Sequence, residues 1–129
     1  MKTIEVVAAV IKNQEGLTLA LQRGESSKQY ISKKWEFPGG KIESGETLQE
    51  ALRRELVEEL KIEASIGEIV TTVYHTYPDF RLIMHAFHCQ IISGELTLTE
   101  HLDKKWLSSS DLISLDWAAA DIPIVDLLV

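Results

Sequence analysis

The chain has 129 residues, a length that fits one domain, residues 1–129, with a single core. Its 13 basic and 20 acidic residues give a net charge of −7, which argues against a nucleic acid polymer as partner. No apolar run reaches the roughly 18 residues of a membrane span, and no signal-type cleavage site follows the first residues. We therefore expect no membrane partner. The single cysteine, Cys89, cannot form an internal disulfide, which suits a reducing compartment, and we expect the protein to be cytoplasmic.

The first half of the chain predicts two strands and a long loop. The β-branched run from Ile4 to Ile11 is typical of a strand that is covered on both faces. Residues 17–22 alternate in polarity, and the turn residues 13–16 before them predict a hairpin. Residues 23–34 are polar without any apolar period, which indicates a surface loop.

A helix follows, and then more strands. Thr47 and Glu50 have the spacing of a capping box, so we predict a helix over residues 48–61. Residues 68–77 and 80–92 have strand composition, with a turn at Pro78 and Asp79. Two short helical segments, 110–112 and 121–123, each have a capping residue in front. Strands predominate in a mixed order, which predicts an α+β sandwich.

The predicted helix crowds three carboxylates beside its apolar stripe. Its leucines recur every four residues, Glu59 projects among them, and Glu55 and Glu58 occupy the adjoining arc. Each like-charge pair at this spacing costs about 0.2 to 0.5 kcal/mol. One interpretation is a solvated surface face relieved by Arg54, which lies four residues before Glu58. The position beside the leucines favours the other, a hard divalent cation such as Mg²⁺ or Mn²⁺ bound by all three acids.

These residues carry a family resemblance. The segment from Gly40 to Ile62 resembles the Nudix box: glycine, five residues, glutamate, seven residues, then Arg-Glu-aliphatic-x-Glu-Glu-x-Gly-aliphatic. The matching positions are Gly40, Glu46, Arg54, Glu55, Leu56, Glu58, Glu59 and Ile62. Lys61 departs from the pattern, because the family usually has glycine there. We expect altered helix-end geometry, a local positive charge and intact chemistry.

The resemblance extends over nearly the whole chain. "WEFPGGKIESGET" is similar to the MutT branch of the family, and "MKTIEVVAAVI", "IEASIGE" and "AAADIP" are similar to the bacterial CTP pyrophosphohydrolase branch. It implies the Nudix fold, a mixed β-sheet between helices. It also implies hydrolysis of a nucleoside diphosphate that is linked to another group.

The same resemblance assigns the catalytic and metal-binding residues. It implies that Glu55, Glu58 and Glu59 hold Mg²⁺, or Mn²⁺, and that the backbone carbonyl of Gly39 completes the shell. Glu55 is our first choice as general base and Glu59 the second. Arg54 is expected to orient the carboxylates through bidentate contacts.

Two box residues are expected to be structural. Glu46 braces the loop before the helix through backbone amides, and glycines, Gly40 among them, let that loop turn tightly. Outside the box, Glu100 lies six residues before Trp106, the separation found in the MutT branch. It is therefore a candidate metal ligand or base. The alternative is a solvated acid in a turn.

Three residues are candidates for substrate binding. Arg23 matches an arginine that contacts phosphate, although a lone arginine at a strand end is often only a surface charge. Phe37 is expected to pack on the base, and Asp121 to bond with it. In the MutT relative an asparagine at this position reads oxidised guanine, whereas the CTP branch has aspartate. An ionised aspartate only accepts hydrogen bonds, whereas a protonated one could also donate. The alternative is that Asp121 merely caps the last helix.

We therefore expect a Mg²⁺-dependent nucleoside triphosphate pyrophosphohydrolase that sanitises the nucleotide pool. Its substrate would be an oxidised purine, such as 8-oxo-dGTP, or a cytidine-type triphosphate. The alternatives are an ADP-ribose or dinucleotide pyrophosphatase, and a non-catalytic Nudix-fold module that binds nucleotides. The sequence leaves open whether the protein is a monomer or a homodimer.

Overall fold

The computed structural model describes residues 1–129 and contains two β-sheets. The larger is mixed, with the strand order β4-β1-β6-β5, and the smaller is antiparallel, with the order β3-β2-β7. The strands of the larger sheet are β1 (Lys2–Ile11), β4 (Gly39–Lys41), β5 (Glu63–Thr76) and β6 (Phe80–Ser93). Those of the smaller are β2 (Thr18–Gln22), β3 (Trp35–Glu36) and β7 (Asp103–Leu107).

Strand β1 is the centre of the larger sheet. It pairs in parallel with β6 and antiparallel with β4, and its residues 7–11 are buried. Ala8 and Val10 belong to one hydrophobic cluster, whereas Val7, Ala9 and Ile11 belong to the other. The prediction of a strand that is covered on both faces is therefore confirmed.

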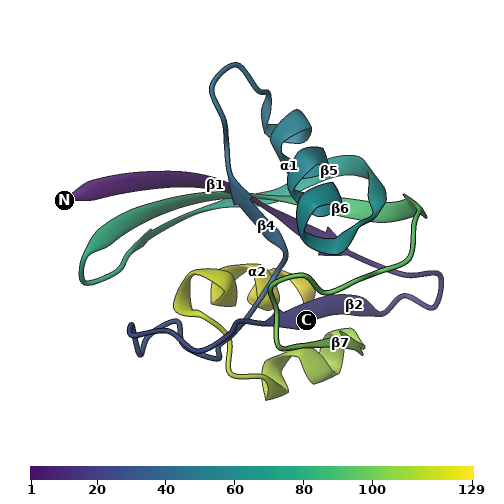
Figure 1. Cartoon of the computed structure of the whole chain (residues 1–129). Helices are drawn as coiled ribbons and strands as arrows, with labels where there is room; N and C mark the ends of the chain where they lie inside the picture. The colour runs from purple at the N-terminus through teal and green to yellow at the C-terminus, as the bar shows by residue number, and fades with distance from the viewer.

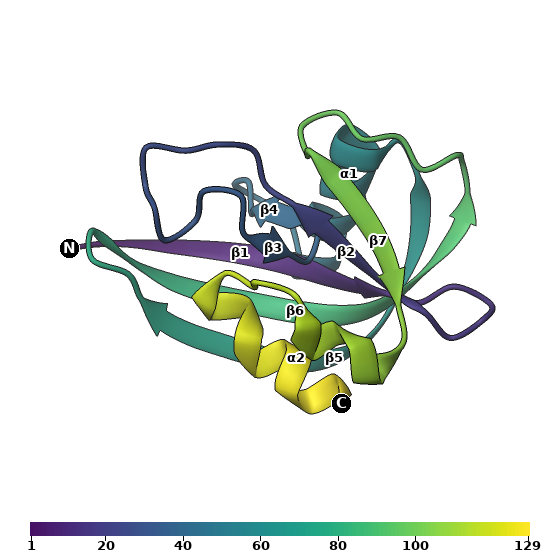
Figure 2. The same cartoon turned by 90° about the horizontal axis from the view of Figure 1, so that it is seen from below.

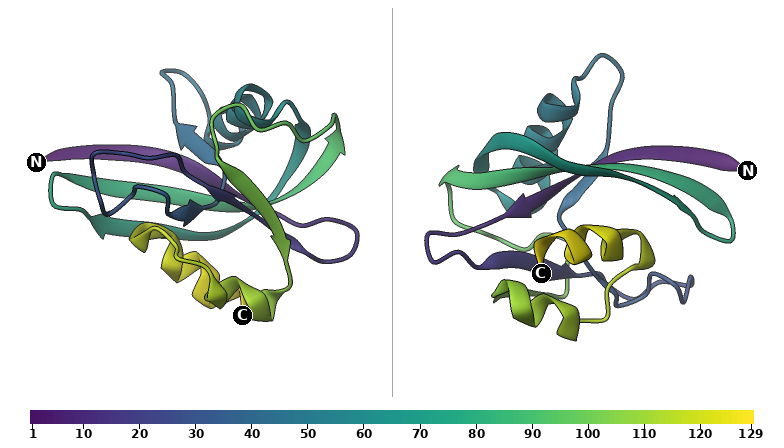
Figure 3. Two further views of the ribbon diagram at one scale, coloured as in Figure 1. Left: turned by 60° about the horizontal axis from the view of Figure 1, so that its bottom comes forward. Right: turned by 180° about the vertical axis from the view of Figure 1, so that it is seen from behind.

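Helices cover the two faces of the larger sheet, as the resemblance implied (Figure 1). Helix α1 (Leu48–Leu60) packs on one face through Leu52, Leu56 and Leu60, all fully buried. The 3₁₀ helices η1 (Ser109–Ser114) and η2 (Ala119–Asp121) and the final helix α2 (Ile122–Leu128) lie on the other side, near the smaller sheet (Figure 3). None of the helices is long and apolar enough to cross a membrane.

The second half of the chain departs from the sequence prediction in its strands. Strand β5 begins at Glu63, five residues before the predicted start at residue 68. Its pairing with β6 is irregular between Ile66 and Thr71, so one strand continues although the alternation of apolar and polar residues is interrupted there. Strand β7 was not predicted at all. Its sequence, DKKWL, is short and begins with three charged residues. The strand lies at the edge of the smaller sheet, where exposed charged residues are common, so it lacks the alternating apolar residues that would have predicted a strand.

The expected caps of the short C-terminal helices are wrong. The helical turn near residue 110 begins at Ser109 after Ser108, which makes no capping hydrogen bond with its side chain. Asp121 precedes α2 and makes none either. Its carboxylate is buried and turned toward Phe37 instead, so a tertiary contact has taken the place of a local cap.

The cysteine is part of the core. Cys89 on β6 is buried, and its thiol donates to the Phe87 carbonyl at 3.6 Å. Burial raises the pKa of this thiol to about 12, so that it stays protonated.

The end of α1 shows how Lys61 replaces the family's glycine. Lys61 adopts the left-handed conformation, with φ 60° and ψ 34°, and its N–H donates to the Val57 carbonyl at 3.1 Å. This is the geometry in which helices usually end on glycine. The expectation of an altered helix end is therefore wrong. The chain keeps the left-handed backbone geometry, in which the Cβ of lysine is sterically strained.

We predict that Lys61→Gly stabilises the protein by about 1 kcal/mol, because glycine has no Cβ to strain the left-handed backbone. Thermal unfolding should show a Tm about 3 to 5 °C higher than that of the parent chain. Arg53→Gly, in the exposed middle of the same helix, is the matched control and should lower the Tm. A Tm for Lys61→Gly at or below the parent value would contradict this explanation.

Candidate active site

A cavity of about 550 Å³ lies between the two sheets and receives side chains from both. Its polar lining comes from strand ends, from the loop between β2 and β3, from α1 and from the segments before β7 and α2. These residues are Arg23, Lys28, Glu36, Lys41, Glu55, Glu59, Glu100, His101 and Asp121. Five are carboxylic acids and three are lysine or arginine. A polyanionic ligand would therefore meet a net negative surface unless a cation accompanied it.

Helix α1 supplies two of these acids. Because its leucines are buried against the sheet, the neighbouring Glu55 and Glu59 are half-buried at the cavity. Burial raises the pKa of the Glu59 carboxyl to about 7, although nearby His101 acts in the opposite direction. Burial also raises the pKa of Glu55, against the lowering effect of its bond with Arg54. Both carboxylates lack enough positive charge nearby to offset their desolvation.

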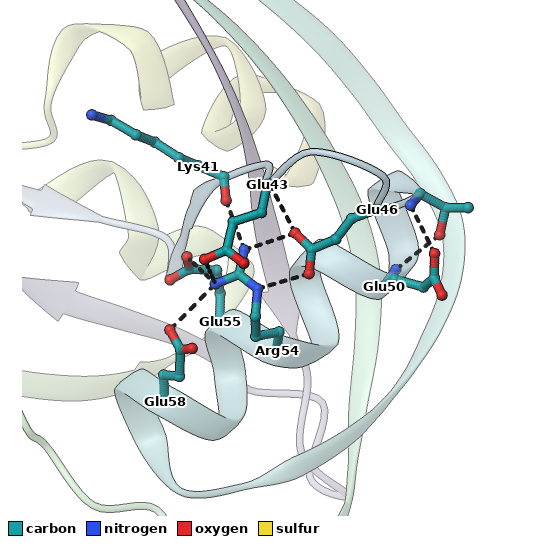
Figure 4. A network of polar contacts seen from close by, with 8 residues as sticks. Lys41, Glu43, Glu46, Glu50, Arg54, Glu55 and Glu58 are labelled. Atoms are coloured by element: carbon teal, nitrogen blue, oxygen red, sulfur yellow. Dashed lines mark hydrogen bonds and ion pairs between the residues drawn. The ribbon is translucent and has the colours of Figure 1, made fainter.

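Arg54 is the centre of a polar network on the outer side of the helix (Figure 4). Its guanidinium binds both oxygens of Glu46, at 2.7 and 2.9 Å, and donates to the Lys41 carbonyl at 2.9 Å. Its Nη1 also reaches Glu55 at 2.9 Å and Glu58 at 3.3 Å. The bidentate contact therefore goes to Glu46 rather than to the three clustered acids, and it ties the helix to the loop before it.

The loop between β4 and α1 has the brace that was expected. Glu46 accepts a hydrogen bond from the Glu43 N–H at 2.8 Å. The capping box is also present, because Glu50 N–H donates to the Thr47 side chain and Thr47 N–H to the Glu50 side chain.

Two glycines let β4 approach its neighbours closely. A Cβ at Gly39 would lie 1.9 Å from the Val7 carbonyl oxygen, and one at Gly40 would lie 2.5 Å from the Glu55 carboxylate. Gly39 N–H points at Glu59, 3.4 Å from its Oε1. Any side chain at either position would therefore displace β1 or a cavity carboxylate.

The structure does not bring Glu58 into the cavity. Its side chain is 60% exposed and is ion-paired with Arg54. Glu100 does line the cavity, although it too is exposed. The segment before it is tied to the end of α1, because the Thr99 hydroxyl donates to the Glu59 carbonyl at 2.7 Å. This tie holds Glu100 near Glu55, where its charge contributes to the raised pKa of Glu55.

Four polar cavity residues were not predicted from the sequence, Lys28, Glu36, Lys41 and His101, and two of them, Glu36 and His101, bind each other. One Glu36 oxygen binds Arg23 at 3.2 Å, and the other binds Nε2 of His101 at 2.9 Å. His101 is almost fully buried, and its Nδ1 has no partner. Burial lowers the pKa of His101, but the bond to Glu36 and the charge of Glu59 outweigh it, so the pKa is raised. These partners lie 13 and 65 residues apart from Glu36, so no local pattern indicated them.

The cavity also contains the predicted base-binding residues. Phe37 is buried and stacks on Trp117, with ring centroids 4.7 Å apart. Its N–H donates to Oδ1 of Asp121 at 3.1 Å. Burial raises the pKa of Asp121 well above its ordinary value, and the Glu36 charge adds to this effect. Asp121 is thus a cavity residue rather than a helix cap, and its Oδ2 has no partner within the chain.

The sequence and fold both match known proteins. The NUDIX domain model matches residues 2–128. The chain belongs to the Nudix hydrolase family. It is 40% identical to the CTP pyrophosphohydrolase of Escherichia coli, over 98% of this chain and 91% of that protein. It is 28% identical to the 8-oxo-dGTP diphosphatase of the same organism, over 97% and 95% respectively. The crystal structure of a MutT protein from Methanosarcina mazei, 28% identical, superposes with a TM-score of 0.84 over 98% of this chain and 91% of that one.

The acids of this Nudix site fit a divalent cation by their chemistry. Oxygen ligands with raised pKa values and too few cationic partners would be stabilised by a hard ion such as Mg²⁺. In the present arrangement no three histidine, cysteine, aspartate or glutamate side chains are close enough together to hold an ion. Glu58 would have to leave Arg54 to join Glu55 and Glu59.

We predict that Glu59→Gln makes the metal-free protein more stable at pH 8. The carboxyl titrates near 4.5 when unfolded and near 7 when folded, so its contribution to stability falls as the pH rises from 4.5 to 7 and stays low above 7. Removing the charge should therefore gain up to about 3 kcal/mol above pH 7 and little below pH 4.5.

Thermal melts at pH 4.5 and pH 8 in a chelating buffer measure this difference. Glu63→Gln, an exposed acid on β5, is the matched control and should leave the Tm unchanged at both pH values. Equal Tm values for Glu59→Gln and the parent at pH 8 would show that Glu59 is not destabilised by its surroundings.

Proposed function

We propose that this Nudix hydrolase is a Mg²⁺-dependent nucleoside triphosphate pyrophosphohydrolase, which releases the nucleoside monophosphate and pyrophosphate. The observation that carries the proposal is the single cavity that joins Glu55 and Glu59 to Phe37 and Asp121. Such a cavity can hold phosphates at one end and a base at the other. The names of the relatives, a CTP pyrophosphohydrolase and 8-oxo-dGTP diphosphatases, support hydrolysis of pyrophosphate bonds in the nucleotide pool.

The acids would share two tasks. Glu55, Glu58 and Glu59 would hold Mg²⁺ or Mn²⁺, helped by Glu100 and the Gly39 carbonyl. When bound, the ion neutralises phosphate oxygens that would otherwise repel a nucleophile. Glu55 takes a proton from the attacking water, with Glu59 as the second choice. The water oxygen bonds to phosphorus, and the bridging P–O bond between the α- and β-phosphates breaks.

Other residues would position the substrate and the acids. Arg54 holds the Glu55 carboxylate through Nη1 and fixes the helix to the preceding loop through Glu46. The Arg23 side chain is 44% exposed and paired with Glu36. It can leave this partly exposed ion pair and turn toward a phosphate. Phe37 offers an aromatic surface to the base, and Asp121 offers Oδ2 to its polar edge.

We predict that Glu55→Gln lowers kcat about 10²- to 10⁴-fold, because the amide cannot accept the proton. Pyrophosphate release with Mg²⁺ would be measured on 8-oxo-dGTP, dGTP, CTP, dCTP, 5-methyl-dCTP and ADP-ribose. Glu63→Gln, away from the cavity, should match the parent protein.

Each outcome of this assay decides something. Equal turnover by the parent and Glu55→Gln would refute the role of Glu55. Preferred turnover of ADP-ribose would favour the alternative of a dinucleotide-type pyrophosphatase. Mg²⁺-enhanced binding without turnover of any compound would favour the non-catalytic module.

We predict that Asp121→Asn changes the base preference. If the amide oxygen keeps the Phe37 N–H, the variant presents an NH₂ donor to the base where the ionised carboxylate of the parent presents an acceptor oxygen. A cytosine amino group then loses its acceptor, and oxidised guanine gains a donor. The ratio of kcat/KM for CTP to that for 8-oxo-dGTP should fall about 10-fold or more. An unchanged ratio would contradict base reading by Asp121.

A further inference from the structure

Two segments from different parts of the fold line the end of the cavity away from Glu59, because Phe80 pairs with Lys2 at the start of β1, whereas Gly39, which contacts Glu59, pairs with Ala8. One is the loop between β2 and β3, residues 23–34, which contributes Lys28 and Ile31. The other is the β5–β6 hairpin, which contributes Tyr77, Phe80 and Leu82. The loop and the hairpin end lie side by side at the same edge of the molecule (Figures 2 and 3). Their contacts therefore determine how closed this end of the cavity is.

Asp79, at the tip of the hairpin, holds the loop through two side chains. Lys28 Nζ lies 2.6 Å from Oδ2 of Asp79, and the Tyr30 hydroxyl donates to Oδ1. The Lys28 ammonium also lies over the Phe80 ring, 5.1 Å from its centroid. One carboxylate thus joins two residues of a loop that has no regular secondary structure.

An aromatic contact extends this connection to the base-binding part of the cavity. Tyr30 stacks on Tyr77, with centroids 5.0 Å apart and planes 23° apart. The Tyr77 hydroxyl accepts a hydrogen bond from the Ala120 N–H at 3.1 Å, and Ala120 precedes Asp121 in the chain. The loop is therefore connected through Tyr77 to the segment that carries Asp121.

These contacts are of a kind that opens readily. The side chains of Lys28 and Asp79 are 43% and 47% exposed, so water and salt compete for their ion pair. The base of the loop, by contrast, is held by backbone pairing of Arg23 N–H with the Lys34 carbonyl at 2.9 Å. The tip can detach while the ends of the loop stay attached to their strands.

We propose that Lys28, Tyr30 and Asp79 form a latch that closes the nucleoside end of the cavity over the bound substrate and limits which bases it accepts. The inference rests on the proposed function for the identity of the substrate. Substrate enters while the latch is open, and closure completes the wall around the base. The latch touches none of the acids assigned to the chemical step, so it acts on binding and selection.

The kinetic test compares Asp79→Ala with Glu68→Ala, an exposed acid on β5 outside the cavity lining. For the best triphosphate substrate, Asp79→Ala should raise KM about 5-fold or more, with kcat within about 2-fold of the parent. The ratio of kcat/KM for the best triphosphate to that for the poorest should be smaller in Asp79→Ala than in the parent. Glu68→Ala should change neither quantity. An unchanged KM in both Asp79→Ala and Lys28→Met would overturn the latch.

A second measurement tests the latch without turnover. Limited trypsin digestion of the folded protein reports cleavage after Arg23, Lys28, Lys33 and Lys34. These sites should be cut about 5-fold faster in Asp79→Ala than in the parent, with equal Tm values. Cytidine 5′-monophosphate or 8-oxo-dGMP should protect the parent loop and protect the variant less.

The two measurements separate the two proposals. If the parent hydrolyses no triphosphate, the proposed function fails, and the trypsin comparison without nucleotide still tests the latch. If hydrolysis occurs but the parent and Asp79→Ala are cut at equal rates, the latch is wrong and the function stands.

Discussion

The site depends on the burial of carboxylates at the border of the hydrophobic core. Helix α1 can be packed on the sheet only by its leucines, and that packing half-buries Glu55 and Glu59. The positive charge beside Glu55 is that of Arg54, whose guanidinium is already shared among Glu46, Glu55 and Glu58. The cation near Glu59 is His101, which is paired with Glu36. The fold therefore maintains acids that are only partly compensated. Such groups persist at the expense of stability, as is common where a site must bind a further charge.

The geometry around these acids explains why their positions are fixed so closely. Gly39 and Gly40 bring the backbone of β4 against β1 and against the Glu55 carboxylate, where a methyl group would collide. Arg54 fixes the other side through Glu46 and the Lys41 carbonyl. The helix, the strand and the loop are thus linked through side chains of one continuous segment, and Glu55 is positioned before any ligand arrives, whereas Glu58 is not.

That continuity also explains how much the sequence could predict. The capping box and the leucine stripe are local features, and both were confirmed in α1. The spacing of the acids was only a partial guide, because Glu55 and Glu59 line the cavity whereas Glu58 pairs with Arg54 outside it. The pairs Glu36–His101 and Tyr30–Asp79 join residues 65 and 49 positions apart, and such contacts leave no period in the chain. Strand β7 was not predicted for a related reason, because the sequence of an edge strand with charged residues resembles that of a loop. At Lys61 a local pattern was misleading instead, because the left-handed helix end is kept although lysine replaces the glycine that usually adopts it.

The buried thiol of Cys89 has a consequence for the environments in which the protein can persist. A protonated sulfur enclosed in the core is a poor nucleophile, so no accessible thiolate is present to attack peroxide, glutathione disulfide or alkylating reagents. No other cysteine exists to form a bridge within the chain. The thiol of the folded molecule is therefore shielded from the redox poise of its surroundings, and labelling of this thiol would report unfolding.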